Sequence, residues 1–215
     1  MSKGDITKKE IASAFKKLME EKSFDSITVT DITSASHLNR LTFYYHFEDK
    51  YDLLNWIYYN EIILTFKKNL DKMNWTESLK IVLNKMRDER KYYMNAFAYD
   101  NKEFRKYMVD AVVELFISII LEWAGDQYIK EEDNRFVSTF FAYGIVGMVI
   151  DWVQDDMRES PEGMIEYIRN LVEDIKLLAI SRYLKGTLSK TTDLPKSDTK
   201  ESLCLRHRDF FSAMI

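Results

Sequence analysis

The stretch that decides the fold is residues 28–50, which read TVTDITSASHLNRLTFYYHFEDK. Thr28 with Asp31 three positions later forms a capping box, a pattern typical of a helix start. Asn39 is a good N-cap for another helix. The stretch therefore predicts two short helices. One ends near residue 36 with Ile32 and Ala35 pointing inward, and the other covers residues 40–47. A brief turn at residues 37–38 would join them.

The second of these helices carries side chains suited to nucleic acid. Phe43 and Phe47 lie four residues apart, so both are expected to face the core. The other positions offer a guanidinium, hydroxyls and an imidazole, which bond phosphates or base edges. Two short helices joined by such a turn form a helix-turn-helix unit, whose second helix enters the major groove. The pattern therefore predicts a DNA-binding surface.

The order and spacing of these residues resemble the TetR family of transcriptional regulators. The match covers about residues 7–54 and rests on TVTDI at 28–32, TFYYHF at 42–47 and Lys50 through Leu53. The resemblance implies the following DNA-binding set: Thr28, Thr30, Arg40, Leu41, Thr42, Tyr44, Tyr45, His46 and Lys50. Within it, Arg40, Leu41 and Tyr45 are expected near bases, and the other six at phosphates.

Two features of the head depart from the expected pattern. The family usually has Gly where this chain has His37, at a position that often needs a left-handed backbone, so a turn that is either strained or differently shaped is expected. Residues 1–72 carry 11 basic and 11 acidic side chains, and the whole chain has a net charge of −4. A DNA-binding head is ordinarily basic. An alternative therefore stays open, a protein-interaction adaptor or co-regulator of the same fold with weak or no DNA binding.

The flanking segments predict further helices around this unit. Thr7 with Glu10 favours a first helix over residues 7–22, and Asp49 is a suitable cap for a fourth helix. Downstream, apolar periodicity predicts helices over 49–72, 76–93, 101–123 and 131–157. The 49–72 helix should turn Leu53, Leu54, Ile57 and Leu64 inward. Ser160 and Pro161 predict the start of a last helix that ends near Gly186.

The fold class that follows is all-α, because the chain has only 6 Gly and 2 Pro and shows long helical periodicity. We expect an N-terminal three-helix helix-turn-helix head and a C-terminal helical bundle whose last two helices dimerise. The predicted domains are 1–50 for DNA binding, 51–186 for effector binding and dimerisation, and 187–215 as a tail, linker or docking segment.

An apolar stripe on the last two predicted helices indicates a dimer seam. Residues from 164 to 178 step by four and three, as in coiled coils, and glycines on the preceding helix allow close approach. The expected interface residues are Phe140, Gly144, Gly147, Met164, Ile168, Leu171, Ile175 and Leu178. An intramolecular core is the alternative. The segment from Phe140 to Trp152 also resembles the dimerisation end of TetR-like regulators.

Aromatic and methionine residues between positions 92 and 123 line either an effector pocket or an ordinary core, and the sequence leaves both open. A small apolar or aromatic effector is one expected signal. The chain also resembles the TetR branch that contains the dihydroxyacetone-kinase operon activator. In that branch a regulatory protein can give the signal instead.

The remaining composition argues against other classes of protein. One cysteine and three well-separated histidines leave no Cys/His zinc site, and no phosphate-binding loop or nucleophile elbow is present. We therefore expect no cofactor, no metal and no enzymatic activity; a small-molecule binding protein or enzyme is the least favoured alternative. The start of the chain is not a signal peptide, and no membrane association is expected. The expected function is a cytoplasmic homodimeric regulator, a repressor, acting on a palindromic double-stranded DNA operator.

Overall fold

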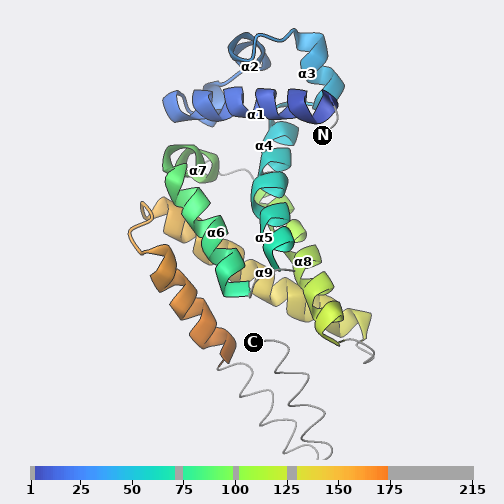
Figure 1. Ribbon diagram of the computed structural model, residues 1–215, viewed down its shortest axis with the longest axis vertical. Helices are drawn as coiled ribbons and strands as arrows, with labels where there is room; N and C mark the ends of the chain where they lie inside the picture. The colour runs from blue at the N-terminus through green and yellow to red at the C-terminus, as the bar shows by residue number, and fades with distance from the viewer. Residues whose placement is uncertain (1–2, 71–74, 99–101, 125–129, 174–215) are drawn as a thin grey trace, which may run out of the picture.

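The computed structural model describes residues 3–70, 75–98, 102–124 and 130–173, and within these ranges every regular element is helical. Three helices form a head at one end of the elongated molecule (Figure 1). They are α1 (Lys3–Glu21), α2 (Val29–Ala35) and α3 (Arg40–His46), with a 3-10 turn at Phe24–Ser26 between the first two. The all-α fold with a helix-turn-helix head is confirmed.

The body of the molecule is joined to the head through α4 (Figure 1). Its elements are α4 (Lys50–Tyr58), the π-helical segment η2 (Tyr59–Ile63), α5 (Leu64–Leu70), α6 (Trp75–Asp88), α7 (Arg90–Ala98), α8 (Lys102–Ala124) and α9 (Glu131–Gln154). A final helix covers 161–173 up to the end of the described chain. α8 packs along α9, while α7 packs against α1 and so brings head and body together.

The head closes around side chains that sequence periodicity placed inward. Ile11 and Phe15 of α1, Ile32 of α2 and Phe43 of α3 are all fully buried. Each such side chain contributes roughly 1.5–3 kcal/mol through removal from water. This small core fixes the orientation of α3 relative to α1 and α2.

The caps lie where the residue pattern predicted them. The Thr28 hydroxyl accepts a hydrogen bond from the Asp31 amide, and the Asp31 carboxylate accepts one from the Thr28 amide. Hydrogen bonds from the Thr28 side chain and then its backbone lower the pKa of Asp31 to about 2. The side chains of Asn39 and Asp49 also accept hydrogen bonds from amides in the first turns of α3 and α4. These bonds satisfy amides that have no partner within the helix.

Two local predictions in the head are wrong. α1 begins at Lys3 rather than Thr7, because no proline interrupts the helix upstream, and Asp5 in the first turn suits the positive end of a helix. Ala35 was expected to face the core but is exposed, and Thr33 is buried in its place. The buried face of the short α2 is therefore rotated about the helix axis relative to the face that its apolar residues indicated.

The predicted single helix over 49–72 is interrupted by η2, one turn of π-helix. Leu53, Leu54 and Ile57 before it are buried as expected. Leu64 after it was expected inward but is 39% exposed. A π turn inserts one extra residue, which rotates everything beyond it about the helix axis. The inward face of α5 therefore starts from a shifted register.

The predicted helix over 76–93 is two helices, α6 and α7, that meet at Glu89. No Pro or Gly marks this junction. α7 turns so that Tyr92 and Tyr93, each 2% exposed, pack beneath the head. Because packing between distant segments sets the bend, local sequence pattern missed it.

The last helices follow the prediction at their junction. α9 ends at Gln154, and a tight loop leads to Ser160, whose hydroxyl accepts a hydrogen bond from the Gly163 amide at 3.0 Å. The final helix begins at Pro161, as the cap predicted. The expected helix ends at Gly125 and Gly186, and the tail from 187 onward, lie outside the described residues.

Candidate DNA-binding surface and effector cavity

The outer face of α3 gathers most of the predicted base-proximal side chains. Leu41 is 80% exposed, Tyr45 83% and Tyr44 48%, and Arg40 is exposed beside them. The Arg40 guanidinium lies over the Tyr44 ring and donates to its hydroxyl at 3.3 Å. α3 lies at the outer end of the head, away from the body (Figure 1). A protruding helix of this kind can enter a major groove about 12 Å wide.

The remaining members of the predicted set flank this face. The Thr42 hydroxyl donates to Asn39 at 2.9 Å, and the ring of His46 packs edge-on against Tyr45. Thr30 is exposed on α2. The Thr28 hydroxyl is engaged in the capping box described above, donating to Asp31 at 2.6 Å. The structure therefore brings the predicted residues of α2 and α3 to one end of the molecule.

The ammonium of Lys50, for which the resemblance implied a phosphate contact, lies against backbone carbonyls of the head. Its ammonium donates to the backbone carbonyls of Phe24, Asp25 and Ile27 at 2.8, 3.1 and 2.9 Å. An ammonium has three donors, so these carbonyls account for its hydrogen-bonding capacity. Burial, only partly offset by the charges of Asp25 and Asp49, lowers the pKa of Lys50. Lys50 thus ties the start of α4 to the loop before α2.

The turn between α2 and α3 adopts the left-handed conformation expected at His37, with φ of 55°. The Leu38 amide donates to the Thr33 carbonyl at 3.0 Å, and the His37 amide donates to the Ser34 carbonyl at 3.3 Å. These two bonds form a Schellman motif, whose left-handed position is usually Gly. His37 therefore holds a conformation that costs a residue with a Cβ atom about 1–2 kcal/mol.

We expect His37→Gly to raise the free energy of unfolding by about 0.5–1 kcal/mol, because relief of strain exceeds the extra entropy of Gly in the unfolded chain. Urea denaturation at one fixed protein concentration measures the change. Ser34→Gly is the control, because the same new residue inside α2 is expected to lower stability. Equal destabilisation by both substitutions would show that the turn is not strained.

One face of α9 exposes large apolar side chains to solvent. We call it the α9 face, and it consists of Phe136, Phe140, Tyr143, Gly144 and Gly147. Phe136, Phe140 and Tyr143 are 75%, 67% and 63% exposed. A Cβ atom at either glycine would meet nothing within 4 Å. Gly inside a helix costs about 0.5–1 kcal/mol relative to Ala. No contact with the described residues of the chain explains why glycine stands at these two positions.

The predicted seam on the final helix is only partly open. Leu171 is 49% exposed, and Met164 is half-buried against the core. Ile168 was expected at the dimer interface but is 4% exposed and lines an internal cavity. Ile168 therefore belongs to the alternative interpretation, an intramolecular core. Ile175 and Leu178 lie outside the described residues.

A cluster of charges joins the head to the body. We call Lys16, Glu61, Lys85 and Glu89 the joint cluster. The ammonium of Lys16, on α1, lies 2.7 Å from Glu61 of η2 and 2.5 Å from Glu89 between α6 and α7. Lys85 contacts the same two carboxylates at 3.4 and 3.1 Å. The Lys16 side chain is only 13% exposed, so water and salt screen these pairs less than surface pairs.

The surroundings of the joint cluster reinforce it. Burial by itself raises the pKa of Glu89, but hydrogen bonds and charges from Lys16, and then from Lys85, outweigh burial and lower that pKa. Asn95 of α7 donates to the carbonyls of Met19 and Lys22 at 2.7 and 2.6 Å, which caps the end of α1. Its side-chain oxygen accepts from the Phe24 amide at 3.1 Å. Together these contacts fix the angle between head and body.

The body contains a partly open apolar cavity of about 370 Å³. Residues of every element from α4 to the final helix line it, among them Ile62, Met86, Met108 and Val146. All lining side chains are apolar or aromatic, and the only side-chain oxygen is the hydroxyl of Tyr58. Ligand pockets usually measure 300–1,000 Å³ and are largely apolar. The cavity suits an uncharged apolar molecule, because burying an unpaired charge is costly.

The sequence left open whether the central aromatic residues form a pocket or a core, and the structure divides them. Phe97, Met108 and Phe116 line the cavity, whereas Tyr92 and Tyr93 are buried outside it. Burial, and then the charges of Glu61 and Glu89, raise the pKa of Tyr92. Both interpretations therefore hold for different residues of the same stretch.

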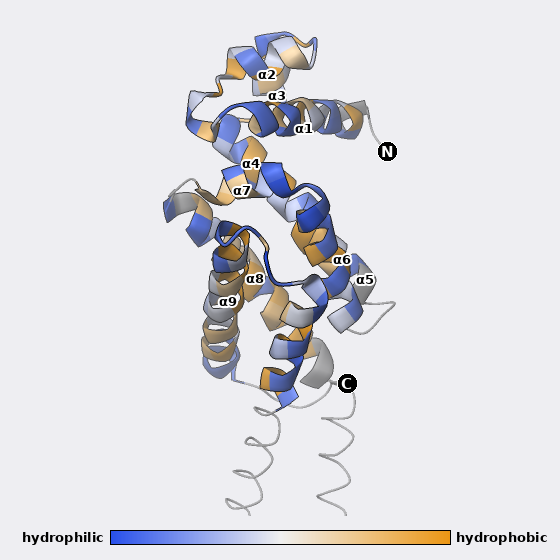
Figure 2. Cartoon of the chain, turned by 90° about the vertical axis from the view of Figure 1, so that its left-hand side faces the viewer, coloured by the Kyte–Doolittle hydropathy of each residue, from blue (hydrophilic) through white to orange (hydrophobic). Residues whose placement is uncertain are grey.

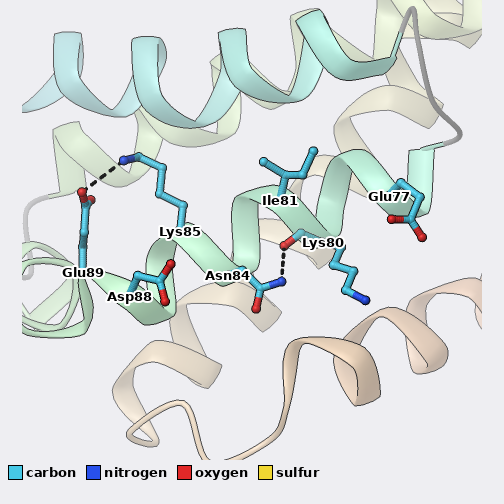
Figure 3. A pocket seen from close by; sticks show the side chains of 7 residues that line it. All are labelled: Glu77, Lys80, Ile81, Asn84, Lys85, Asp88 and Glu89. Atoms are coloured by element: carbon cyan, nitrogen blue, oxygen red, sulfur yellow. Dashed lines mark hydrogen bonds and ion pairs between the residues drawn. The ribbon is translucent and has the colours of Figure 1, made fainter.

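A second hollow, of about 480 Å³, lies on α6 and is lined mostly by charged side chains (Figure 3). Lys85 donates to Glu89, and the Asn84 amide donates to the Lys80 carbonyl, as the dashed lines show. Lys80 also pairs with Glu162 of the final helix at 3.3 Å. These groups bond to one another, so the hollow is a weaker ligand site than the apolar cavity.

Sequence reasoning missed the joint cluster and Asn95. Apart from Lys85 and Glu89, which are four positions apart, the contacting residues lie 24 to 76 positions apart in the chain and look like ordinary solvated residues on helix surfaces. One sequence without contacts contains no signal that pairs them. No group of three or more His, Cys, Asp or Glu residues in the described chain is placed to hold a metal ion.

Comparison with family models gives two matches. Residues 11–57 match the model described as bacterial regulatory proteins, tetR family. Residues 73–174 match the model described as transcriptional regulator C-terminal region. The two matches follow one another along the chain and cover both the head and the body.

Individual relatives agree with these matches. The chain is 29% identical over 147 residues to the HTH-type dhaKLM operon transcriptional activator DhaS of Lactococcus lactis, covering 67% of this chain and 78% of that protein. A solved structure of the dihydroxyacetone kinase operon activator DhaS has a TM-score of 0.63 at 27% identity, covering 80% of this chain and 97% of the other. A TetR regulator structure from Streptococcus agalactiae has a TM-score of 0.56 at 22% identity, covering 79% and 94%.

Proposed function

The chain belongs to the TetR family of DNA-binding transcriptional regulators, and from that premise we propose that it acts as a homodimer on a palindromic operator. The observation that carries this proposal is the exposed outer face of α3 at the end of the molecule. Two such helices in a dimer would enter major grooves about 34–36 Å apart, one turn of DNA.

The proposed division of labour follows the chain. Residues 1–50 bind DNA, residues 51–186 bind the effector and dimerise, and residues 187–215 serve as a tail, linker or docking segment. Arg40, Leu41 and Tyr45 lie at base edges, and Thr30, Thr42, Tyr44 and His46 lie toward phosphates, with Thr28 at the start of α2 beside them. The ammonium of Lys50 ties the start of α4 to the loop before α2.

The α9 face supports the dimer. By length and composition α9 could cross a membrane. Its most apolar 18-residue stretch has a mean hydropathy of 1.7, and only 39% of that stretch is buried. Exposed aromatic residues beside two glycines are what a helix needs to pack closely against the same helix of a second copy. Two operator half-sites also require two heads. We propose that a second copy of the chain covers this face and that the protein is cytoplasmic. Figure 2 shows apolar residues along α9.

The apolar cavity supports control by a small uncharged ligand. Ile62 and Ile63 of η2 line it, while Glu61 of the same turn contacts Lys16 in the head. A ligand that enters the cavity and displaces η2 would therefore also move the head. Ligand binding would shift the population between two head orientations. A thermal-shift screen of uncharged apolar compounds tests this proposal. If no compound stabilises the protein, a partner protein is the remaining candidate for the signal.

The sign of regulation is proposed from the named relatives. Repression was the expectation from the sequence, whereas the DhaS proteins that the chain resembles are described as operon activators. We propose positive control and no catalytic activity. Transcription of the bound operon in cells with and without the gene decides between activation and repression.

The test of DNA recognition is selection of bound fragments from random-sequence duplex DNA by the purified full chain. A palindromic consensus is expected, and the double variant Arg40→Ala/Tyr44→Ala, which alters only exposed side chains, should lose it. No enrichment at low salt by a folded, dimeric protein would overturn the proposal. It would favour the adaptor function that the near-neutral head also allows.

A further inference from the structure

The two most exposed large apolar side chains in the described part of the chain lie next to each other on α3. Leu41 and Tyr45 are 80% and 83% exposed. They are four residues apart in a helix, so their side chains lie on the same face, one turn from the other. Phe43 between them is fully buried. Leu41 and Tyr45 therefore present a small apolar surface outward from the helix.

The chemistry of Leu41 limits what it recognises. A leucine side chain has no donor or acceptor, so it reads neither a phosphate nor the hydrogen-bonding edge of a base. Among the four bases, only thymine places a methyl group in the major groove, and apolar side chains recognise it by contact. The aromatic ring of Tyr45 one turn away extends the same apolar surface.

The charges of the head make this contact more important. Lys16 of α1 and Lys22 just after it pair with carboxylates, and Lys50 donates to three carbonyls. These ammonium groups are therefore less available to neutralise phosphates, which is the usual source of affinity. Arg40 and the Tyr44 hydroxyl remain beside Leu41 as polar groups. Apolar contact with bases thus supplies a larger share of binding than in a basic head.

We propose that Leu41, together with the ring of Tyr45, selects operator half-sites by contact with the 5-methyl group of thymine. The proposal rests on the DNA recognition proposed above and deepens it, because it names the base feature that α3 reads. It predicts thymine at one equivalent position in each half-site.

Two random duplex libraries test this, one containing thymine and the other containing uracil, which pairs identically but lacks the methyl group. The full chain is expected to enrich a palindrome with a fixed thymine from the first library and to lose that preference in the second. In the selected operator, replacing that thymine by uracil should weaken binding about fourfold per methyl group. Replacement in both half-sites should weaken it about sixteenfold.

Variants assign the effect to the residue. Leu41→Ala is expected to discriminate less between the thymine and uracil operators, because only the Tyr45 ring and the small Ala side chain are left to contact the methyl group. The fold should survive because the side chain of Leu41 is exposed. Ile81→Ala, at an exposed position on α6 in the body, should keep the full ratio. Dissociation constants from fluorescence anisotropy give these ratios directly.

The outcomes separate the inference from the function on which it rests. The same palindrome enriched equally from both libraries would overturn methyl recognition and leave DNA recognition standing. A thymine preference that Leu41→Ala retains in full would also overturn the role of Leu41. No consensus from either library would overturn the proposed function, and the inference with it.

Discussion

Phe140→Glu is expected to convert the dimer into monomers and to weaken operator binding by roughly 10²–10⁴-fold. The side chain is 67% exposed on the α9 face, so the substitution should leave the monomer folded. In a dimer it would bury an unpaired carboxylate at an apolar interface, and loss of the second head removes the gain from binding both half-sites. Sedimentation measures the association, and anisotropy with the selected operator measures the affinity.

Three controls make the dimer test specific. Phe140→Leu keeps the apolar contact and should keep the dimer. Ile81→Glu makes the same kind of change on α6 and should leave association unchanged. Gly144→Ala should stabilise the helix, since no described residue meets the new Cβ atom, yet weaken the dimer if a partner helix approaches closely. A Phe140→Glu protein that remains dimeric would show that the α9 face is not the interface.

Lys16→Met is expected to lower the free energy of unfolding by about 2 kcal/mol. It leaves Glu61 and Glu89 beside each other with only Lys85 to balance them. Breaking a fully buried ion pair costs about 3–5 kcal/mol, and the partial exposure of this cluster reduces that figure. The control is Lys106→Met, because the Lys106–Asp110 pair is 77% and 59% exposed and should contribute less than 1 kcal/mol.

The same variant predicts a change in pH dependence. The pKa of Glu89 is lower in the folded state than its usual value of 4.5, so its stabilisation is present above pH 4.5. That stabilisation is lost as pH falls through the lowered, folded-state pKa. In Lys16→Met burial dominates and the loss on acidification should shrink. Urea denaturation at pH 7 and pH 4 checks this, and identical pH profiles for both proteins would contradict the role of Lys16.

The candidate site was predictable to the extent that it is local. Thr28, Asn39 and Asp49 cap helices through bonds to amides two or three residues away, which a sequence displays directly. The alternation of Phe43 and Phe47 with polar neighbours then set which face of α3 is exposed. The head, its turn at His37 and its family were therefore recognisable from a single stretch of 23 residues.

Other assignments depend on where distant segments of the chain meet. Lys50 matched the family motif by position, but its ammonium contacts residues 23 to 26 positions earlier in the chain. Ile168 fits a heptad seam, yet packing turns it into the cavity. Leu64 fits the inward stripe of one long helix until η2 shifts the register. A periodic pattern cannot specify which of two apolar environments a side chain enters.

The sequence by itself thus determined the helices, their caps, the helix-turn-helix head and the family, because each depends on bonds or periodicities within one or two turns of chain. Only the tertiary structure decided the bend at Glu89, the joint cluster, the apolar cavity and the partners of Lys50. These depend on contacts between residues tens of positions apart, such as Lys16 with Glu89, where close packing and the pairing of buried charges determine the arrangement.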